Sequence, residues 1–311
     1  MGNLHLASIG SVYLETNYIG LETAGRDHLE IGKEYRAASY AVGLGGSAVN
    51  FAVQAKALGL DISLIGKVGD DEQGKKIISF LSDAQISSNL IHVSREVQTS
   101  VDTGIVLAHS GQNIQLVSGN ANQSLSLSDI PLSHPDFSDI SSVYLGGYFK
   151  QESLYLAYPE LLQKISGLGK KIYLDHGRAP VDVAPDKLEI LKSSLPFVEG
   201  YFLNDTELFA ITGTTVMSDA IAQVRSFGAK FVVIKQGEKG CMVVTQNISN
   251  QIATTSVVAT NTVGAGDAFN AGFLSKYIAG ADIYSAAMYG NMVATYKVAH
   301  NVVVLPDMLD N

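Results

Sequence analysis

Cysteine is nearly absent from this chain of 311 residues, which carries Cys241 alone. A single cysteine excludes an intramolecular disulfide and any metal site built from several cysteines. The neighbours of Cys241 are small or apolar, with Gly240 before it and 242–244 (MVV) after it. We therefore predict a buried thiol that takes no part in chemistry.

Positive charge is also scarce. The chain has 21 Lys and Arg against 30 Asp and Glu, a formal net charge of −9 that no basic run offsets. This balance argues against nucleic acid or an anionic membrane as the main partner. An acidic protein can still bind ATP through backbone amides and a divalent cation.

Long apolar runs are missing too. No window approaches a membrane-spanning segment, and the N-terminus, MGNLH, lacks the basic region of a secretion signal. Hydrophobic residues make up 46% of the chain and charged residues 16%, which favours a well-buried globular enzyme over a disordered protein. We expect a soluble, cytoplasmic protein.

The chain does contain alternating apolar runs and helical patterns. Such alternation favours a mainly parallel sheet with helices on both faces and ligands at the carboxyl ends of its strands. We find no repeat or linker and predict one domain over residues 1–311. The expected strands are 4–12, 60–68, 143–145, 172–174, 201–203 and 231–235, and the expected helices are 48–58, 72–81, 154–165, 186–191, 219–227, 266–279 and 283–299.

Residues 261–267 (NTVGAGD) run directly into one of these helices. The small residues 264–266 expose backbone at the helix start, where unpaired N–H groups and the helix dipole favour an anion. A carboxylate beside that anion hole, Asp267, can take a proton from an alcohol while the hole stabilises the transferred group. The segment indicates phosphoryl transfer to a hydroxyl, and by itself it leaves an ordinary helix start as the alternative.

Two segments, about 13–40 and 101–118, interrupt the alternation. The first contains two short stretches with β character, 29–31 and 34–36, and the second is typical of a hairpin that turns at 109–113. Together they could form a small β-sheet lid. A lid over a phosphoryl-transfer site excludes water, which competes as an acceptor.

Three further motifs agree with phosphoryl transfer to a hydroxyl. They are 45–50 (GGSAVN) with 66–71 (GKVGDD), 204–207 (NDTE), and 234–240 (IKQGEKG). In this order and spacing the chain resembles the ribokinase-like (PfkB) carbohydrate kinase family over nearly its whole length. The resemblance implies a ribokinase-like three-layer α/β sandwich, with a central mainly parallel sheet and a small β lid. It also implies ATP and Mg²⁺ as cosubstrates and an alcohol group as phosphate acceptor.

The resemblance assigns roles by position. Asp267 would be the catalytic base, and the backbone amides of Gly264, Ala265 and Gly266 would form the anion hole. Asn204 and Glu207 would organise Mg²⁺ through water, although the same spacing also makes a helix capping box. The nucleotide positions are Asn204, Lys235, Gly237, Gly240 and Asn291, and the acceptor positions are Tyr13, Glu15, Gly45, Gly46, Asn50, Arg178 and Asp267.

The chain departs from the family pattern at several positions. Glu15 stands where the family usually has Asp, Tyr13 where ribokinases have Asn, and Ser47 where they have Lys. Asn261 replaces an Asp that helps many members to hold a monovalent cation. Because Asn keeps an oxygen ligand but loses the charge, this change weakens the case for a K⁺ site at Asn261 and Val263.

We therefore expect a transferase, an ATP-dependent kinase of a small sugar. A pentose or a related sugar is favoured because 119–126 (GNANQSLS) is ribokinase-like. A nucleoside kinase of the same family is the alternative, with Tyr13, Tyr18 and Tyr35 as candidate stacking partners. A non-catalytic sensor on the same fold is more distant, and a dinucleotide oxidoreductase lacks its glycine pattern. A homodimer through the lid agrees with the resemblance.

Overall fold

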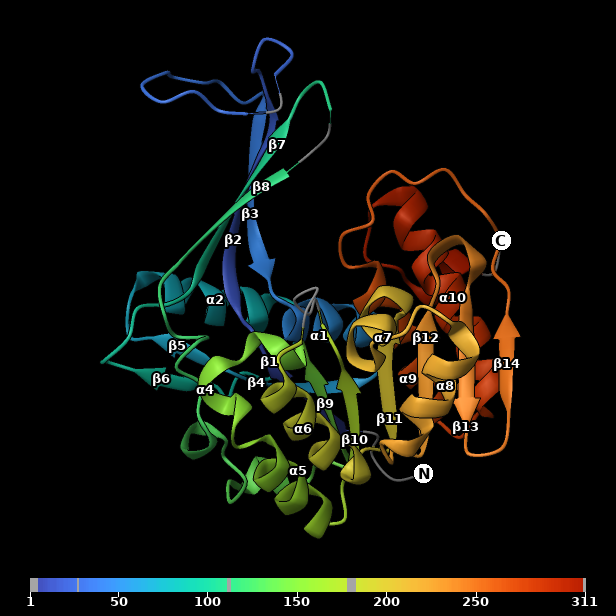
Figure 1. Ribbon diagram of the computed structural model, residues 1–311. Helices are drawn as coiled ribbons and strands as arrows, with labels where there is room; N and C mark the ends of the chain where they lie inside the picture. Colours follow the sequence, from blue (N-terminus) through green and yellow to red (C-terminus); the bar gives the residue numbers. More distant parts are fainter. Residues whose placement is uncertain (1–4, 27, 111–112, 178–182, 310–311) are drawn as a thin grey trace.

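A central sheet of eight strands organises the computed structural model, which describes residues 5–26, 28–110, 113–177 and 183–309 (Figure 1). The six strands from β12 to β4 pair in parallel, and β13 and β14 continue the sheet in antiparallel fashion. The order is β14 (Ser249–Ile252), β13 (Cys241–Thr245), β12 (Phe231–Lys235), β11 (Gly200–Asn204), β10 (Lys171–Asp175), β9 (Ser142–Gly146), β1 (His5–Gly10) and β4 (Asp61–Ile65).

Helices cover both faces of this sheet, as the alternating pattern predicts (Figure 1). Successive side chains of a strand point to opposite faces, so Tyr144 and Leu145 of β9 belong to two different hydrophobic clusters. One face packs against α1 (Ser47–Ala57), α2 (Glu72–Asp83), α9 (Ala265–Ile278) and α10 (Ile283–His300). The other packs against α3 (Pro135–Ser138), α4 (Glu152–Tyr155), α5 (Tyr158–Gly167), α6 (Pro185–Ser194), α7 (Asp205–Thr212) and α8 (Met217–Ser226).

A separate four-stranded sheet stands beside the carboxyl edge of the parallel strands (Figure 1). Its order is β3 (Ser39–Gly45), β2 (Tyr13–Leu21), β7 (Val101–Leu107) and β8 (Asn113–Ser118). Strand β2 pairs in parallel with β7, which joins the two segments predicted to form a lid. Because β2 begins at Tyr13, soon after β1 ends at Gly10, the small sheet reaches the end of the central sheet.

Three local predictions are wrong. The described residues between β2 and β3 contain no strand, so the stretches 29–31 and 34–36 are irregular. The run 60–68 divides at Gly66 into β4 and β5 (Lys67–Gly69), and β5 pairs with β6 (His92–Ser94) in a small sheet of its own. The helix 154–165 divides into α4 and α5, because Pro159 lacks an N–H group and is tolerated in the first turn of a new helix.

The hairpin of β13 and β14 was not predicted from the sequence, and α7 was anticipated only through the capping-box alternative at 204–207. Within the described ranges, no helix has the length and apolarity needed to cross a membrane.

Candidate functional site

Three polar residues end neighbouring parallel strands and therefore lie at one edge of the sheet. Strand β10 ends at Asp175, β11 at Asn204 and β12 at Lys235, and the last two are register partners. The Lys235 ammonium donates to Asp175 Oδ1 at 2.8 Å. Such an edge is where open α/β sheets bind ligands.

Asp175 is held as a buried anion. Asn270 on α9 donates to Asp175 Oδ1 at 2.9 Å and to the Tyr144 hydroxyl at 3.0 Å. Burial alone would raise the pKa of Asp175, but Lys235, Asn270 and His176 together hold this pKa below its ordinary value. The carboxylate therefore keeps a negative charge at the end of the sheet.

The predicted anion hole lies at the start of α9, next to this ion pair. Gly264 is the residue before the helix and has a φ of 76°, a conformation that favours glycine. A Cβ on Gly266 would lie 3.3 Å from Lys235 Nζ, so the ammonium lies against the first helical turn. One predicted donor is engaged elsewhere, because the Ala265 N–H donates to Thr262 O at 3.2 Å.

Asp267, the predicted base, is half-buried in the first turn of α9. Burial and the negative charge of Asp175 raise the pKa of Asp267 to about 7, whereas Lys235, Lys150 and a hydrogen bond with Asn50 lower it. A carboxylate with a pKa near neutrality is a stronger base than an ordinary Asp, and about half of such groups are ionised at neutral pH.

Asn204 and Glu207 form the capping box that was the alternative interpretation of their spacing. Asn204 Oδ1 accepts from the Glu207 N–H at 2.8 Å, and Glu207 Oε2 accepts from the Asn204 N–H at 2.8 Å. The other carboxylate oxygen of Glu207, Oε1, takes no part in the capping box. Burial raises the pKa of Glu207 to about 7; Asp175 also raises it, and Lys235 lowers it.

These oxygen donors fit Mg²⁺ held mainly through water. Within the described residues, no group of three or more His, Cys, Asp or Glu is placed to hold a metal ion directly. Mg²⁺ commonly keeps several waters and binds through one or two carboxylates plus the phosphates of a substrate. Glu207 and Asn204 offer such a partial set of ligands.

The predicted acceptor glycines lie where β3 passes into α1. A Cβ on Gly45 would lie 2.5 Å from Glu15 Oε2, and a Cβ on Gly46 would lie 2.3 Å from Ser11 O. Gly46 also has a φ of 103°. Gly46 therefore excludes a side chain, whereas a side chain at Gly45 would displace the Glu15 carboxyl. The helix that follows brings Asn50 into hydrogen-bonding contact with Asp267.

Sequence reasoning missed two charged residues of this region, Asp102 and Lys150. Asp102 on β7 is the register partner of Glu15 on β2. Burial raises the pKa of both carboxyls, and Asp102 Oδ1 is a buried atom without a hydrogen-bond partner. The positive charge of Lys150 lowers the pKa of both Asp102 on β7 and Asp267 on α9. Only the pairing of distant strands reveals this arrangement.

The ribokinase-like segment 119–126 is anchored beside Tyr13. The Asn122 side chain accepts from the Val12 N–H at 2.9 Å and donates to Val12 O at 3.0 Å. Partial burial raises the pKa of Tyr13, while hydrogen bonds with Asn122 and Ser11 lower it. These contacts place the segment against the start of β2.

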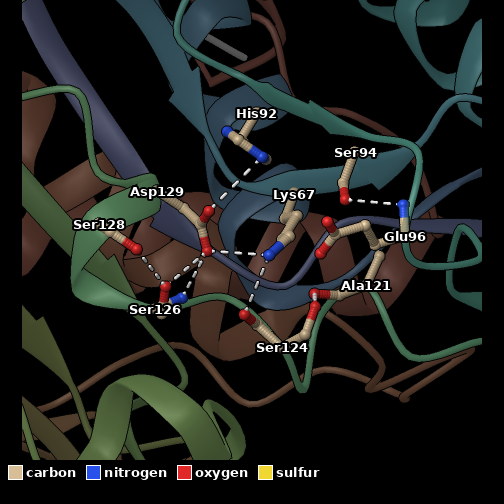
Figure 2. Close-up of polar contacts among 9 residues, drawn as sticks. All are labelled: Lys67, His92, Ser94, Glu96, Ala121, Ser124, Ser126, Ser128 and Asp129. Carbon is tan, nitrogen blue, oxygen red and sulfur yellow. Dashed lines mark hydrogen bonds and ion pairs between the residues drawn. The ribbon is translucent and has the colours of Figure 1, made fainter.

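Lys67, from the second motif, has a structural role. Figure 2 shows its ammonium between Asp129 Oδ2, at 3.0 Å, and the Ser124 carbonyl oxygen, at 3.2 Å. Asp129, in the short helix η1 (Leu127–Asp129), also accepts from the Ser126 N–H at 2.9 Å. This network fixes the end of the segment 119–126 to β5 (Figure 2).

Three further polar residues lie in or near the core. His176 is fully buried against Tyr201, and burial lowers the pKa of His176 to about 3. Cys241 is buried as predicted, and burial raises its pKa to about 12. Asn291 donates to Ile252 O at 3.1 Å.

The motif 234–240 contains two predicted nucleotide positions, Gly237 and Gly240, at a short helix. Gly237 begins the 3-10 helix η4 (Gly237–Lys239), and Gly240 follows it with a φ of 84°. Arg178 lies outside the described residues.

Comparison with known proteins gives consistent matches. A family model described as pfkB family carbohydrate kinase matches residues 5–305. Deoxyribokinase of Salmonella typhi is 28% identical over 301 residues, which cover 95% of this chain and 92% of that protein.

Two solved structures share the fold over nearly the whole chain. Arabidopsis thaliana ribokinase complexed with ribose and ATP superimposes with a TM-score of 0.77 at 21% identity, covering 98% of this chain and 95% of that one. A protein from E. coli in complex with ATP and Mg²⁺ has a TM-score of 0.81 at 18% identity, covering 98% of this chain and 97% of that one.

Proposed function

Because the chain belongs to the pfkB family of carbohydrate kinases and is an ATP-dependent sugar kinase, we propose that its acceptor is a free pentose or a related neutral sugar. The observation that carries this proposal is the position of Asp267. Its carboxyl has a pKa of about 7, forms a hydrogen bond with Asn50 of the acceptor segment and lies in the first turn of α9.

In the proposed mechanism Asp267 accepts the proton of the attacking hydroxyl. The backbone at Gly264 and Gly266 and the Lys235 ammonium lie where they would stabilise charge on the transferred phosphoryl group. Asn204 and Glu207 would hold Mg²⁺ through water, and the ion would neutralise phosphate charge. Catalysis would then come mainly from positioning and electrostatics.

The charges around the acceptor position support a neutral sugar. Glu15, Asp102 and Asp267 contribute three carboxyls to this region, and among the described residues the ammonium of Lys150 acts on Asp102 and Asp267 while that of Lys235, paired with Asp175, acts on Asp267. Carboxylates accept hydrogen bonds from sugar hydroxyls and repel a phosphate group. A sugar phosphate is therefore disfavoured.

A coupled assay of ADP release tests the proposal. The panel contains free pentoses, deoxypentoses, hexoses, sugar phosphates and nucleosides, each at several concentrations. We expect the highest kcat/KM with a free pentose or a deoxypentose. A preference for a sugar phosphate would contradict the charge argument. A compound that raises the melting temperature in a thermal-shift assay but causes no ADP release would identify a sensor.

A nucleoside is the second candidate because an aromatic ring borders the acceptor position. A Cβ on Gly46 would lie 3.2 Å from Cδ2 of Tyr13. A ring at this place can stack on a base. The same panel separates the two classes, since a nucleoside kinase would prefer a nucleoside over the corresponding free sugar.

A homodimer formed through the small sheet is part of the proposal. The small sheet exposes several large apolar side chains, and a cluster of such side chains marks an interaction surface. By register Tyr18, Tyr40, Val42 and Leu116 share one face of the sheet, and Ile19 and Val117 lie on the other. Sedimentation of the wild type and of a Leu116→Lys variant tests this surface, and a cytoplasmic location stays a prediction.

A further inference from the structure

The loop that precedes the anion hole is closed by its own hydrogen bonds. Asn261 Oδ1 accepts from the Val263 N–H at 2.9 Å, and Asn261 Nδ2 donates to Asn301 Oδ1 at 3.1 Å. The backbone N–H groups of Thr260 and Asn261 both donate to Val298 O. The Asn261 side chain therefore joins the loop to the end of α10 and brings no negative charge.

This arrangement does not fit the K⁺ ion that the family resemblance implies at Asn261 and Val263. A K⁺ ion in this position needs carboxylate or carbonyl oxygens directed at it. Here the amide oxygen of Asn261 accepts from the Val263 N–H, and its amide nitrogen donates to Asn301.

A lysine ammonium lies next to the same loop. Lys297 is in the last turn of α10, and its Cε lies 3.9 Å from the place where a Cβ on Gly264 would be. Its Nζ is 3.4 Å from Asn301 Oδ1, the atom that also accepts from Asn261. The end of the Lys297 side chain thus lies between the loop and the first residue of the anion hole.

The charge of Lys297 has no carboxylate partner within the part of the chain that the structure describes. Among the residues that the structure describes, no carboxylate lies within ion-pair distance of Lys297 Nζ, whereas Lys235 on the other side of the hole is paired with Asp175. Burial lowers the pKa of Lys297, as expected for an ammonium that loses water and gains no carboxylate. An anion at the helix start would supply the missing partner.

We propose that the Lys297 ammonium takes the place of a monovalent cation beside the anion hole, so that the enzyme works without K⁺. The inference rests on the proposed function of Gly264–Gly266 as the phosphoryl site. A tethered ammonium supplies the same positive charge as a bound ion, and it is already in place before the substrates arrive. Lys297 is thereby a positioning residue that strengthens the field at the helix start.

The experiment compares wild type, Lys297→Met and Lys297→Arg in choline chloride and in potassium chloride at equal ionic strength. We expect wild-type kcat to be the same in both salts. Lys297→Met should lose about ten-fold or more of kcat in choline, because one charge beside the hole is removed. K⁺ should restore part of the loss by occupying the place of the ammonium next to Asn301 Oδ1, and not the site at Asn261 and Val263. Lys297→Arg should keep most of the activity in both salts.

Two readouts do not depend on sugar turnover, so they remain decisive if the proposed acceptor is wrong. Calorimetry of a non-hydrolysable ATP analogue should show the same affinity in the two salts for wild type and a weaker affinity in choline for Lys297→Met. Anomalous diffraction from Rb⁺-soaked crystals should show no ion beside Asn261 in wild type. Lys276→Met, on the exposed side of α9, is the control for loss of a lysine.

Three results would overturn the proposal. The first is strong activation of the wild type by K⁺, or a Rb⁺ ion beside Asn261 in its crystals. The second is a Lys297→Met enzyme that is fully active in choline. The third is a folded Lys297→Met enzyme that neither K⁺ nor Rb⁺ improves, because Lys297 would then contribute more than charge. Circular dichroism verifies that each variant is folded.

Discussion

Lys235 and Asp175 form an ion pair of 2.8 Å that directs an ammonium against the helix start at Gly266. The pair joins the ends of β10 and β12, two strands separated by β11 in the sheet. Its two charges act in opposite directions on Asp267, since Asp175 raises the pKa of Asp267 and Lys235 lowers it. The pKa of the proposed base on α9 therefore depends on its burial and on two residues at the ends of strands.

Replacement of the proposed base tests the mechanism most directly. We expect Asp267→Asn to lower kcat by about 10³-fold, because the amide cannot accept the hydroxyl proton. Nucleotide affinity, measured by calorimetry, should stay within a few-fold of wild type. Asp83→Asn, an exposed carboxylate on α2, serves as the control. Undiminished turnover by Asp267→Asn would refute its role as base.

The pH dependence should report the Lys235–Asp175 pair. The proposed base acts when ionised, so kcat/KM should rise with pH through an apparent pKa near 7. Asp175→Asn removes a negative neighbour and should move this acid limb to lower pH. Lys235→Met removes a positive neighbour and should move it to higher pH. Shifts in the same direction for both variants would contradict the assignment.

The carboxyl that the sequence analysis missed should control affinity for the acceptor. Asp102 has a buried oxygen without a partner and lies opposite Glu15. We expect Asp102→Asn to raise the KM for the sugar by about ten-fold, because an amide is a weaker acceptor for sugar hydroxyls. The KM for ATP should not change. Glu34→Gln, exposed in the segment between β2 and β3, is the control, and an equal effect of both variants would argue against a contact with sugar.

The Lys67 network should contribute stability more than catalysis. Lys67→Met leaves Asp129 nearly buried without its cation, although the hydrogen bonds from Ser126 remain. We expect the free energy of unfolding in urea to fall by about 2 kcal/mol, less than for a completely unpaired buried charge. Lys76→Met, exposed on α2, should unfold like wild type. A normal unfolding midpoint for Lys67→Met would show that the pair adds no net stability.

Much of the architecture follows from local sequence patterns. Strands β9 to β12 are apolar because both of their faces are covered, so their positions can be read from composition alone. The small residues of 261–267 likewise predict a helix start, where α9 begins, and the capping box that was the alternative at 204–207 begins α7. Residues 29–31 and 34–36 failed as strands because a short β pattern needs a neighbouring strand to pair with.

The charged environment of the site depends on contacts between distant segments. Asp102 meets Glu15 only through the pairing of β7 with β2, and Lys297 reaches Gly264 only because α10 packs along α9. Electrostatic interactions act through space and not along the chain, so spacing in the sequence cannot reveal them. The motifs predict which groups carry the chemistry, whereas the packing of strands and helices sets the pKa of Asp267 and places Lys297 beside the predicted anion hole.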